Sequence, residues 1–418
     1  MSRKQKKSAP PPAHWIHSTC LHVVLYSMLL VATPFVMLQN FLQDAIARLS
    51  RWSVAAGSVD VPIVPTTAAV LFVVLLIAFR RYITRMRILA GVMAVLMIAL
   101  AQQITDYYFG HKFYDLQQNW HYIAYAIFAF MLFRDLAPRG HSLARIGLIT
   151  WIAALLFSTF DETFQLHMSN RVFDIGDIAK DVWGALTGIL VLYIGGPQAP
   201  DLRADLAQLR HRKIAEYFRR PLSLLVLLFV LSLLLLVFSS LLTEFEYGGI
   251  AVLLTLVTFA VFFLLYHFSQ FRWGAYGVAL LVIAAIVTQA VFYYQHRNDQ
   301  IVHNRPGLTV YKGFAVPFFD LLIFPDGSFR PVDKKEYFNA RDQRFLLRHK
   351  PDILLVGTGT EGRGGRGFPK TGVSQFMYNT YTQRGTQVII LRTPDACRLF
   401  NRLKREQKNV MFVIHNTG

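Results

Sequence analysis

Long apolar runs fill the chain up to His296, and only short ones follow. A helix rises about 1.5 Å per residue, so roughly 20 apolar residues cross the hydrocarbon core of a bilayer. The pattern therefore predicts nine spans, at residues 21–42, 62–79, 88–105, 119–133, 146–160, 181–195, 222–242, 249–267 and 274–294. The spans at 119–133 and 146–160 are short, which leaves open that one of them is re-entrant.

Beyond His296, apolar runs of about five residues alternate with polar stretches. Four runs predict buried strands: FDLLIF, ILLVG, QVIIL and VMFVI. Helical stretches are predicted between them, near 335–349, 373–384 and 394–407. This alternation indicates a small α/β domain with a partly parallel sheet. Asp326-Gly327 predicts a turn, and Thr393-Pro394 predicts a helix start with Thr393 as cap.

The predicted fold class is an α-helical polytopic membrane bundle of about nine transmembrane helices, followed by a C-terminal α/β soluble domain. Five segments are expected: a disordered basic tail at 1–20, a transmembrane bundle at 21–196, a basic cytoplasmic connector helix at 197–220, a three-helix transmembrane anchor at 221–295 and the α/β domain at 305–418. The connector has helical periodicity with a basic face, which suits either a solvated helix or contact with anionic headgroups.

Composition supports a membrane protein, with 54% hydrophobic residues and a net charge of +18. The basic residues gather in short loops between apolar runs, which argues against nucleic-acid binding. Eighteen Lys and Arg fall on one side of the predicted spans and five on the other, so the amino terminus is expected in the cytoplasm of an inner (cytoplasmic) membrane protein. Nine spans then place the C-terminal domain outside. Two cysteines, Cys20 and Cys397, exclude a disulfide framework and a cysteine metal site.

Four carboxylates gather where one apolar run ends and the next begins, and we call them the acidic cluster: Asp161, Glu162, Asp177 and Asp181. Charge at a membrane boundary persists where it faces protein or water and has partners. Arg171 and Lys180 are the nearest candidate partners, and loop charge places the cluster on the outer face.

Helical spacing groups these residues further. Gln165 lies four residues after Asp161 and three after Glu162, so all three share one helix surface. Asp177 and Asp181 begin a stripe that continues with Gly184 and Gly188, small residues that let another helix approach closely. His121 and Tyr125 are four apart on a third predicted helix.

Residues 88–196 resemble the VanZ-like family of membrane proteins. The resemblance is carried by Asp161-Glu162, Gln165, Arg171, Asp177, Gly184, Gly188, His121 and Tyr125. Two positions depart from the family: Asp181 stands where Asn is common, and Gln117 where an acidic residue is common. The resemblance implies a cell-envelope protein related to those that give low-level resistance to a lipoglycopeptide antibiotic.

Two interpretations of the acidic cluster stay open. In the first, an enzyme or binding protein acts on a lipid-linked envelope precursor or another amphiphile, and membrane lipids surround it. Its catalytic residues are then Glu162, Asp161 and His121, and its substrate-binding residues are Gln165, Arg171, Asp177, Asp181 and Tyr125. In the second, the carboxylates form a structural network that holds helices together. No metal ligand is predicted, although magnesium or calcium would suit the oxygen ligands, and no cofactor is indicated.

Residues 305–416 resemble the family of the mitochondrial complex I assembly factor three and an adipogenesis-associated cytosolic protein. The matching residues are Pro351 to Gly359, Thr393, Ala396-Cys397-Arg398, Asn401, Leu403 and Glu406. The resemblance implies an α/β fold and contact with a protein partner, so the alternative function is a non-enzymatic membrane scaffold or assembly factor. The Gly-rich segment Gly357 to Pro369 predicts either an exposed loop or an anion-binding turn.

Overall fold

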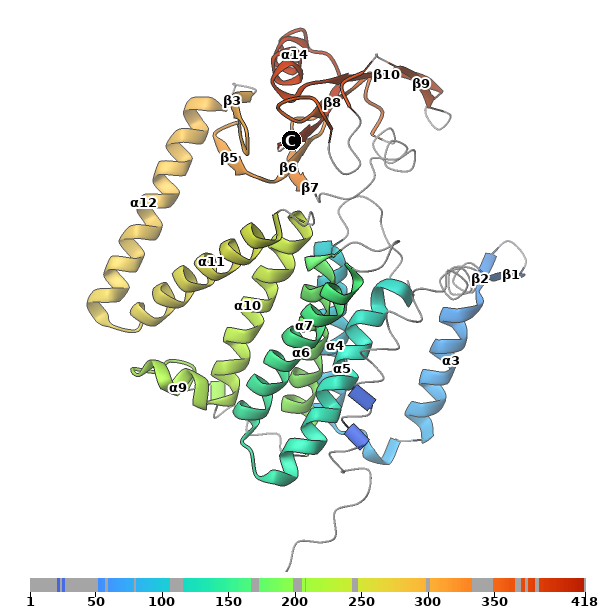
Figure 1. Ribbon diagram of the computed structural model, residues 1–418, viewed down its shortest axis with the longest axis vertical. Helices are drawn as coiled ribbons and strands as arrows, with labels where there is room; N and C mark the ends of the chain where they lie inside the picture. The colour runs from blue at the N-terminus through green and yellow to red at the C-terminus, as the bar shows by residue number, and fades with distance from the viewer. Residues whose placement is uncertain are drawn as a thin grey trace, which may run out of the picture. The chain divides into compact units, whose positions relative to one another are not determined.

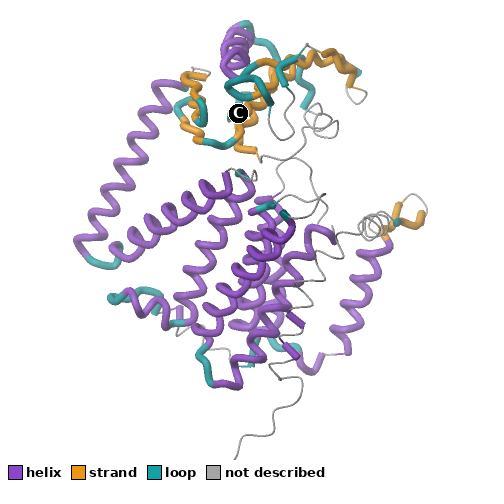
Figure 2. The backbone as a smooth tube through the Cα atoms, viewed as in Figure 1, coloured by secondary structure: helices purple, strands orange, loops and turns teal. Residues whose placement is uncertain are grey.

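The computed structural model describes most of the chain, with helices first and a sheet domain last (Figures 1 and 2). The described residues are 21–22, 25–26, 52–56, 59–78, 80–105, 116–166, 173–197, 205–206, 208–242, 247–297, 301–332, 349–364, 370–372, 375–379 and 383–416. They form two compact units. The first holds residues 1–99, 113–173 and 177–232, and the second holds residues 100–112, 174–176 and 233–418.

Long helices follow the apolar runs of the sequence. They are α3 (Ile63–Ala78), α4 (Arg85–Thr105), α5 (Leu116–Leu136), α6 (Leu143–Gln165), α7 (Ile175–Gly195), α10 (Pro221–Leu241), α11 (Gly248–Phe268) and α12 (Arg272–His296). In the first unit, α7 is the most deeply buried of the candidate membrane helices. Its Trp183 is fully buried and donates a 2.9 Å hydrogen bond from Nε1 to the backbone carbonyl of Met97 in α4. Burying so large a ring with its N–H paired stabilises the contact between these helices.

Six of the described helices are long and apolar enough to cross a membrane: α4, α6, α7, α10, α11 and α12. The prediction of nine spans is therefore not confirmed. The predicted span at 62–79 is α3, whose 16 residues are fewer than a bilayer needs. The predicted span at 119–133 is α5, which begins with polar residues and ends with Arg134 and Asp135. The predicted span at 21–42 lies almost entirely outside the described residues.

The predicted basic connector at 197–220 is not one continuous helix. Residues 209–213 are non-helical, and the short helix α9 follows at Ile214–Arg219. His211 lies in the non-helical stretch, buried with its Nε2 2.8 Å from the Ser223 hydroxyl in α10. Tertiary contacts of this kind can override the helical periodicity of a segment.

The second unit contains a six-stranded sheet in the order β7-β6-β11-β8-β10-β9 and a three-stranded sheet in the order β3-β4-β5. The first sheet comprises β6 (Asp320–Ile323), β7 (Phe329–Val332), β8 (Ile353–Thr358), β9 (Gln375–Asn379), β10 (Arg384–Leu391) and β11 (Val410–His415); the second comprises β3 (Ile301–Arg305), β4 (Leu308–Tyr311) and β5 (Phe314–Pro317). Strand β8 runs parallel to both β10 and β11, while β6, β7 and β9 pair antiparallel. A partly parallel sheet was predicted and is present.

Alternate residues of the central strands face opposite sides of the sheet. Leu354 and Val356 belong to one buried cluster, and Leu355, between them, belongs to the other. The second cluster includes Ala396 and Phe400 of α14 (Thr393–Arg405), which covers that face. A strand buried on both faces explains the continuous apolar runs in the sequence.

Two predictions for this domain are wrong in detail. The helix predicted at 373–384 is instead the edge strand β9 and the start of β10. Thr393 is not the helix cap: Arg392 takes that place, and the Thr393 hydroxyl binds the backbone of other elements. The helix predicted at 394–407 and the Asp326-Gly327 turn are confirmed. The helix predicted at 335–349 falls almost wholly outside the described residues.

Candidate functional site

Three helices of the first unit bring the predicted site residues together. His121 and Tyr125 come from the second and third turns of α5, Asp161, Glu162 and Gln165 from the last two turns of α6, and Asp177 and Asp181 from the first two turns of α7. Residues three or four apart lie on one face of each helix, as the sequence spacing predicted.

Asp181 is the centre of this arrangement. Its Oδ1 lies 2.9 Å from Nδ1 of His121, and its Oδ2 accepts a 2.7 Å hydrogen bond from the Ser158 hydroxyl of α6. Asp181 and Ser158 are both buried. Both oxygens of one buried carboxylate are therefore used to connect α5, α6 and α7.

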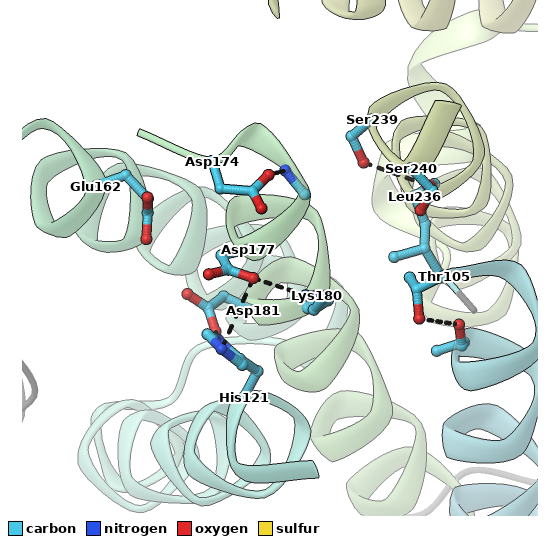
Figure 3. Close-up of polar contacts among 12 residues, drawn as sticks. Thr105, His121, Glu162, Asp174, Asp177, Lys180, Asp181, Leu236, Ser239 and Ser240 are labelled. Atoms are coloured by element: carbon cyan, nitrogen blue, oxygen red, sulfur yellow. Dashed lines mark hydrogen bonds and ion pairs between the residues drawn. The ribbon is translucent and has the colours of Figure 1, made fainter. Parts of the chain in front are cut away.

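Asp177 lies at the more exposed edge of the group. Its Oδ1 accepts a 2.7 Å hydrogen bond from Nζ of Lys180 and lies 3.8 Å from Nε2 of His121 (Figure 3). The accessible fraction of the side chain falls from 27% at Asp177 to 18% at His121 and 6% at Asp181. The imidazole thus stands between an accessible carboxylate and a buried one, with a different ring nitrogen facing each.

Glycines of α7 make this contact possible. A Cβ atom on Gly184 would lie 2.8 Å from the backbone Cα of Tyr122 and 2.9 Å from the carbonyl oxygen of His121. At Gly188 it would lie 2.7 Å from the carbonyl oxygen of Ala126. Such distances admit no side chain, so these glycines allow the α5 backbone to lie directly against α7. The close approach predicted for the small residues is present.

Glu162 and Asp161 form the α6 part of the site. Glu162 is buried, and its Oε1 accepts a 2.9 Å hydrogen bond from Nε2 of Gln165. The same amide nitrogen lies 3.4 Å from Oδ2 of Asp161. The other oxygen of Asp161, Oδ1, is buried and has no hydrogen-bond partner among the described residues. A carboxylate oxygen in this state is costly unless a proton or a further donor reaches it.

One predicted substrate-binding residue, Arg171, lies outside the described residues. Lys180 is described and contacts Asp177. Within the described part of the chain, no group of three His, Cys, Asp or Glu is arranged to hold a metal ion.

Ser158 is the site residue that sequence analysis did not find. It lies in an otherwise apolar part of α6, four residues before Glu162 and therefore on the same helix face. In the sequence, the available signal was a hydroxyl residue four positions before Glu162. Serine is common in packed membrane helices, so this signal alone does not distinguish a site from a helix contact.

Three amides of the Gly-rich segment after β8 donate hydrogen bonds within the protein. The amide of Gly359 donates to the Thr393 hydroxyl, that of Gly362 to the carbonyl of Gly359, and that of Gly364 to the carbonyl of Thr358. Residues 365–369 are not described. These three amides already have acceptors in the protein, which does not support the anion-binding interpretation.

Comparisons with known proteins agree with both resemblances. Residues 21–196 match the VanZ/LLP1 family model, and residues 313–415 match the model described as a protein of unknown function (DUF498/DUF598), the family of the complex I assembly factor and adipogenesis-associated protein. A search of curated proteins finds no match. The solved structure titled MT938 matches at 19% identity over 28% of this chain and 98% of its own, with a TM-score of 0.23, which is too low to support an argument.

Proposed function

Because this chain joins a VanZ-like region of membrane helices to a DUF498-type sheet domain, we propose that it is a cell-envelope membrane protein that binds the polar head of an amphiphile. The proposed ligand class is a lipid-linked envelope precursor. The proposed site consists of His121, Asp177 and Asp181 with Glu162 and Asp161 beside them. Loop charge favours an outward-facing site.

The position of His121 carries this proposal. The ring lies between a buried carboxylate and an accessible one, and its Nε2 is 3.8 Å from Asp177, beyond hydrogen-bond distance. An imidazole held in this way can accept or donate a proton at a molecule that enters from the accessible side.

The surroundings suit a ligand that is polar at one end only. On α6, Leu156, Phe160 and Phe164 are more than half exposed and recur every four residues, so they form an apolar stripe that leads to the last turn. In a membrane this stripe lies against hydrocarbon. An amphiphile could place its chain along the stripe and its head near Asp161.

The proposed roles follow from these contacts. His121 transfers the proton, Glu162 and Asp161 act as acid or base, and Asp177 and Gln165 bind hydroxyl or amine groups of the head. Tyr125 and Arg171 complete the ligand contacts. Asp181 has both oxygens on protein donors, which favours a supporting role over direct contact with the ligand.

Glu162→Gln tests the proposal, since it keeps the shape of the side chain and removes its charge. The protein would be placed in lipid nanodiscs and titrated with a fluorescent polyprenyl-diphosphate-linked sugar, and lipoglycopeptide tolerance of expressing cells would be measured in parallel. We expect binding to weaken about tenfold at unchanged membrane abundance. Asp352→Asn, an exposed carboxylate in the other unit, is the matched control. Loss of abundance with unchanged binding per molecule would favour the structural interpretation.

A second candidate, an assembly factor that recruits a protein through its C-terminal domain, is favoured by charge. Residues 301–418 carry nineteen Lys and Arg against nine Asp and Glu. Arg398, Arg402 and Arg405 are exposed along one side of α14. Replacing Arg402 and Arg405 by Glu in the full chain would abolish capture of an acidic partner and leave amphiphile binding unchanged.

A further inference from the structure

We infer that Asp181 and Ser158 are positioning residues that keep a proton on Nδ1 of His121, so that Nε2 is the atom that exchanges protons with the bound molecule. This inference rests on the proposed function and assigns a separate role to each residue and to each ring nitrogen of the site. Neither Ser158 nor the two ring nitrogens had a role in the sequence prediction.

The first step concerns Nδ1. An ionised carboxylate only accepts hydrogen bonds, and Oδ1 of Asp181 lies 2.9 Å from Nδ1. If Asp181 is ionised, Nδ1 must therefore carry the hydrogen, whether the ring is neutral or charged. Buried carboxylates commonly fix the tautomer of a working histidine in this way.

The second step concerns the carboxylate itself. Asp181 would be free to rotate if only one of its oxygens were bound. The hydroxyl of Ser158, which is fully buried, donates to Oδ2 at 2.7 Å. Two donors on two oxygens fix the carboxylate plane. Ser158 therefore acts on His121 through Asp181.

The third step concerns the ring. Gly184 lets the backbone at His121 and Tyr122 lie against α7, so the imidazole has little room to retreat from Asp181. Its Nε2 makes no hydrogen bond to a described residue and faces the accessible edge near Asp177. The other charged groups that face the ring are Lys180 on α7 and Asp161 on α6.

Nitrogen NMR of the full chain in nanodiscs tests the inference. With ¹⁵N-labelled histidine, the signals of His121 are those missing from the spectrum of His121→Gln. We expect Nδ1 to remain protonated at every pH and Nε2 alone to gain and lose its proton. A neutral ring with its proton on Nε2, or with Nδ1 unprotonated against a protonated Asp181, would overturn the inference.

Variants of Ser158 separate positioning from packing. In Ser158→Ala the Nε2-protonated tautomer should appear, and binding of the fluorescent polyprenyl-diphosphate-linked sugar should weaken about tenfold. Ser158→Thr keeps the hydroxyl and should restore both readouts, which a lost packing contact would not do. An unchanged tautomer in Ser158→Ala contradicts the inference. A shifted tautomer together with unchanged binding in His121→Gln would instead reject the proposed function and leave the positioning assignment standing.

Discussion

Asp320 and His415 are 95 residues apart in the sequence, yet an oxygen of Asp320 lies 3.1 Å from Nδ1 of His415 inside the C-terminal domain. The two residues are in adjoining strands, β6 and β11, and both side chains are almost fully buried. Asp320 also accepts a 2.9 Å hydrogen bond from the amide of Asn416. One carboxylate thus contacts both the last residue of β11 and the backbone amide of the residue that follows it.

Removing this carboxylate should destabilise the domain. Asp320→Ala removes the carboxylate that contacts the His415 ring and the Asn416 amide, and losing one partner of a buried hydrogen bond costs about 1–3 kcal/mol. The measurement is the urea dependence of proteolysis of the C-terminal domain in the detergent-solubilised full chain. Asp352→Asn, an exposed carboxylate of the same domain, should change stability by no more than about 0.5 kcal/mol. Equal effects of the two variants would argue against the pair as a stabilising element.

A methyl group on Gly184 should separate α5 from α7. Gly184→Ala places Cβ 2.8 Å from the backbone of Tyr122, where the helices must shift, at a cost of about 1–3 kcal/mol. Gly91→Ala in α4 is the matched control, because no atom lies within 4 Å of its added Cβ. The control should be neutral or gain up to about 1 kcal/mol from helix propensity. Thermal unfolding of the two detergent-solubilised variants gives the comparison, and similar melting temperatures would mean that the α5–α7 contact is looser than described.

Most strands of the sheet domain could be predicted from the sequence because the central strands are buried on both faces. Runs such as VMFVI have no polar position, and in the structure they form β11 and its neighbouring strands. The strand β9 was missed because its sequence, QFMYN, mixes polar and aromatic residues without a clear period. It pairs only with β10 at the sheet edge, and such pairing depends on a partner strand that local sequence does not reveal.

The candidate site was predictable within each helix and not between helices. Spacing correctly placed Asp177, Asp181, Gly184 and Gly188 on one surface of α7, since helical periodicity is a local property. The contacts of Asp181 with His121 and Ser158 join residues 60 and 23 positions away. No local pattern determines which turns of three helices meet, so Ser158 was not identified.

Cys397 should not react with alkylating reagents in the folded protein. The thiol is buried in α14, and burial raises its pKa to about 12. At pH 8 only about one thiol in ten thousand is then ionised, and the thiolate is the reactive form. We expect N-ethylmaleimide to leave the Cys397 peptide unmodified for hours at pH 8 and to label it within minutes in urea, as read by mass spectrometry. Rapid labelling of the native protein would show that α14 opens readily.

The connector around His211 should loosen in mild acid. Burial holds the pKa of His211 below its ordinary value of 6.5, so the folded state disfavours the protonated ring. Stability from this group is complete above pH 6.5 and decreases as pH falls through that value toward the folded pKa. Hydrogen-exchange protection of residues 208–220 should therefore be lower at pH 5.5 than at pH 7.5. His211→Gln cannot titrate, so its protection should not depend on pH, and an equal drop in both proteins would assign the effect to another group.

The C-terminal domain should lie outside the cytoplasm. The nine spans predicted from the sequence, with the amino terminus in the cytoplasm, would put eighteen Lys and Arg in the inner segments and five in the outer ones, and short basic loops resist translocation. Alkaline phosphatase fused after Gly418 should be active, and a fluorescent protein fused there should be dark. A fusion after Gly196 ends after the sixth predicted span and should give the opposite pattern. Fluorescence at both positions would mean that one predicted span after Gly196 does not cross the membrane. The reverse of the expected pattern at both positions would mean that a predicted span before Gly196 does not cross. The first to suspect is then α3, because its 16 residues are too few for a bilayer.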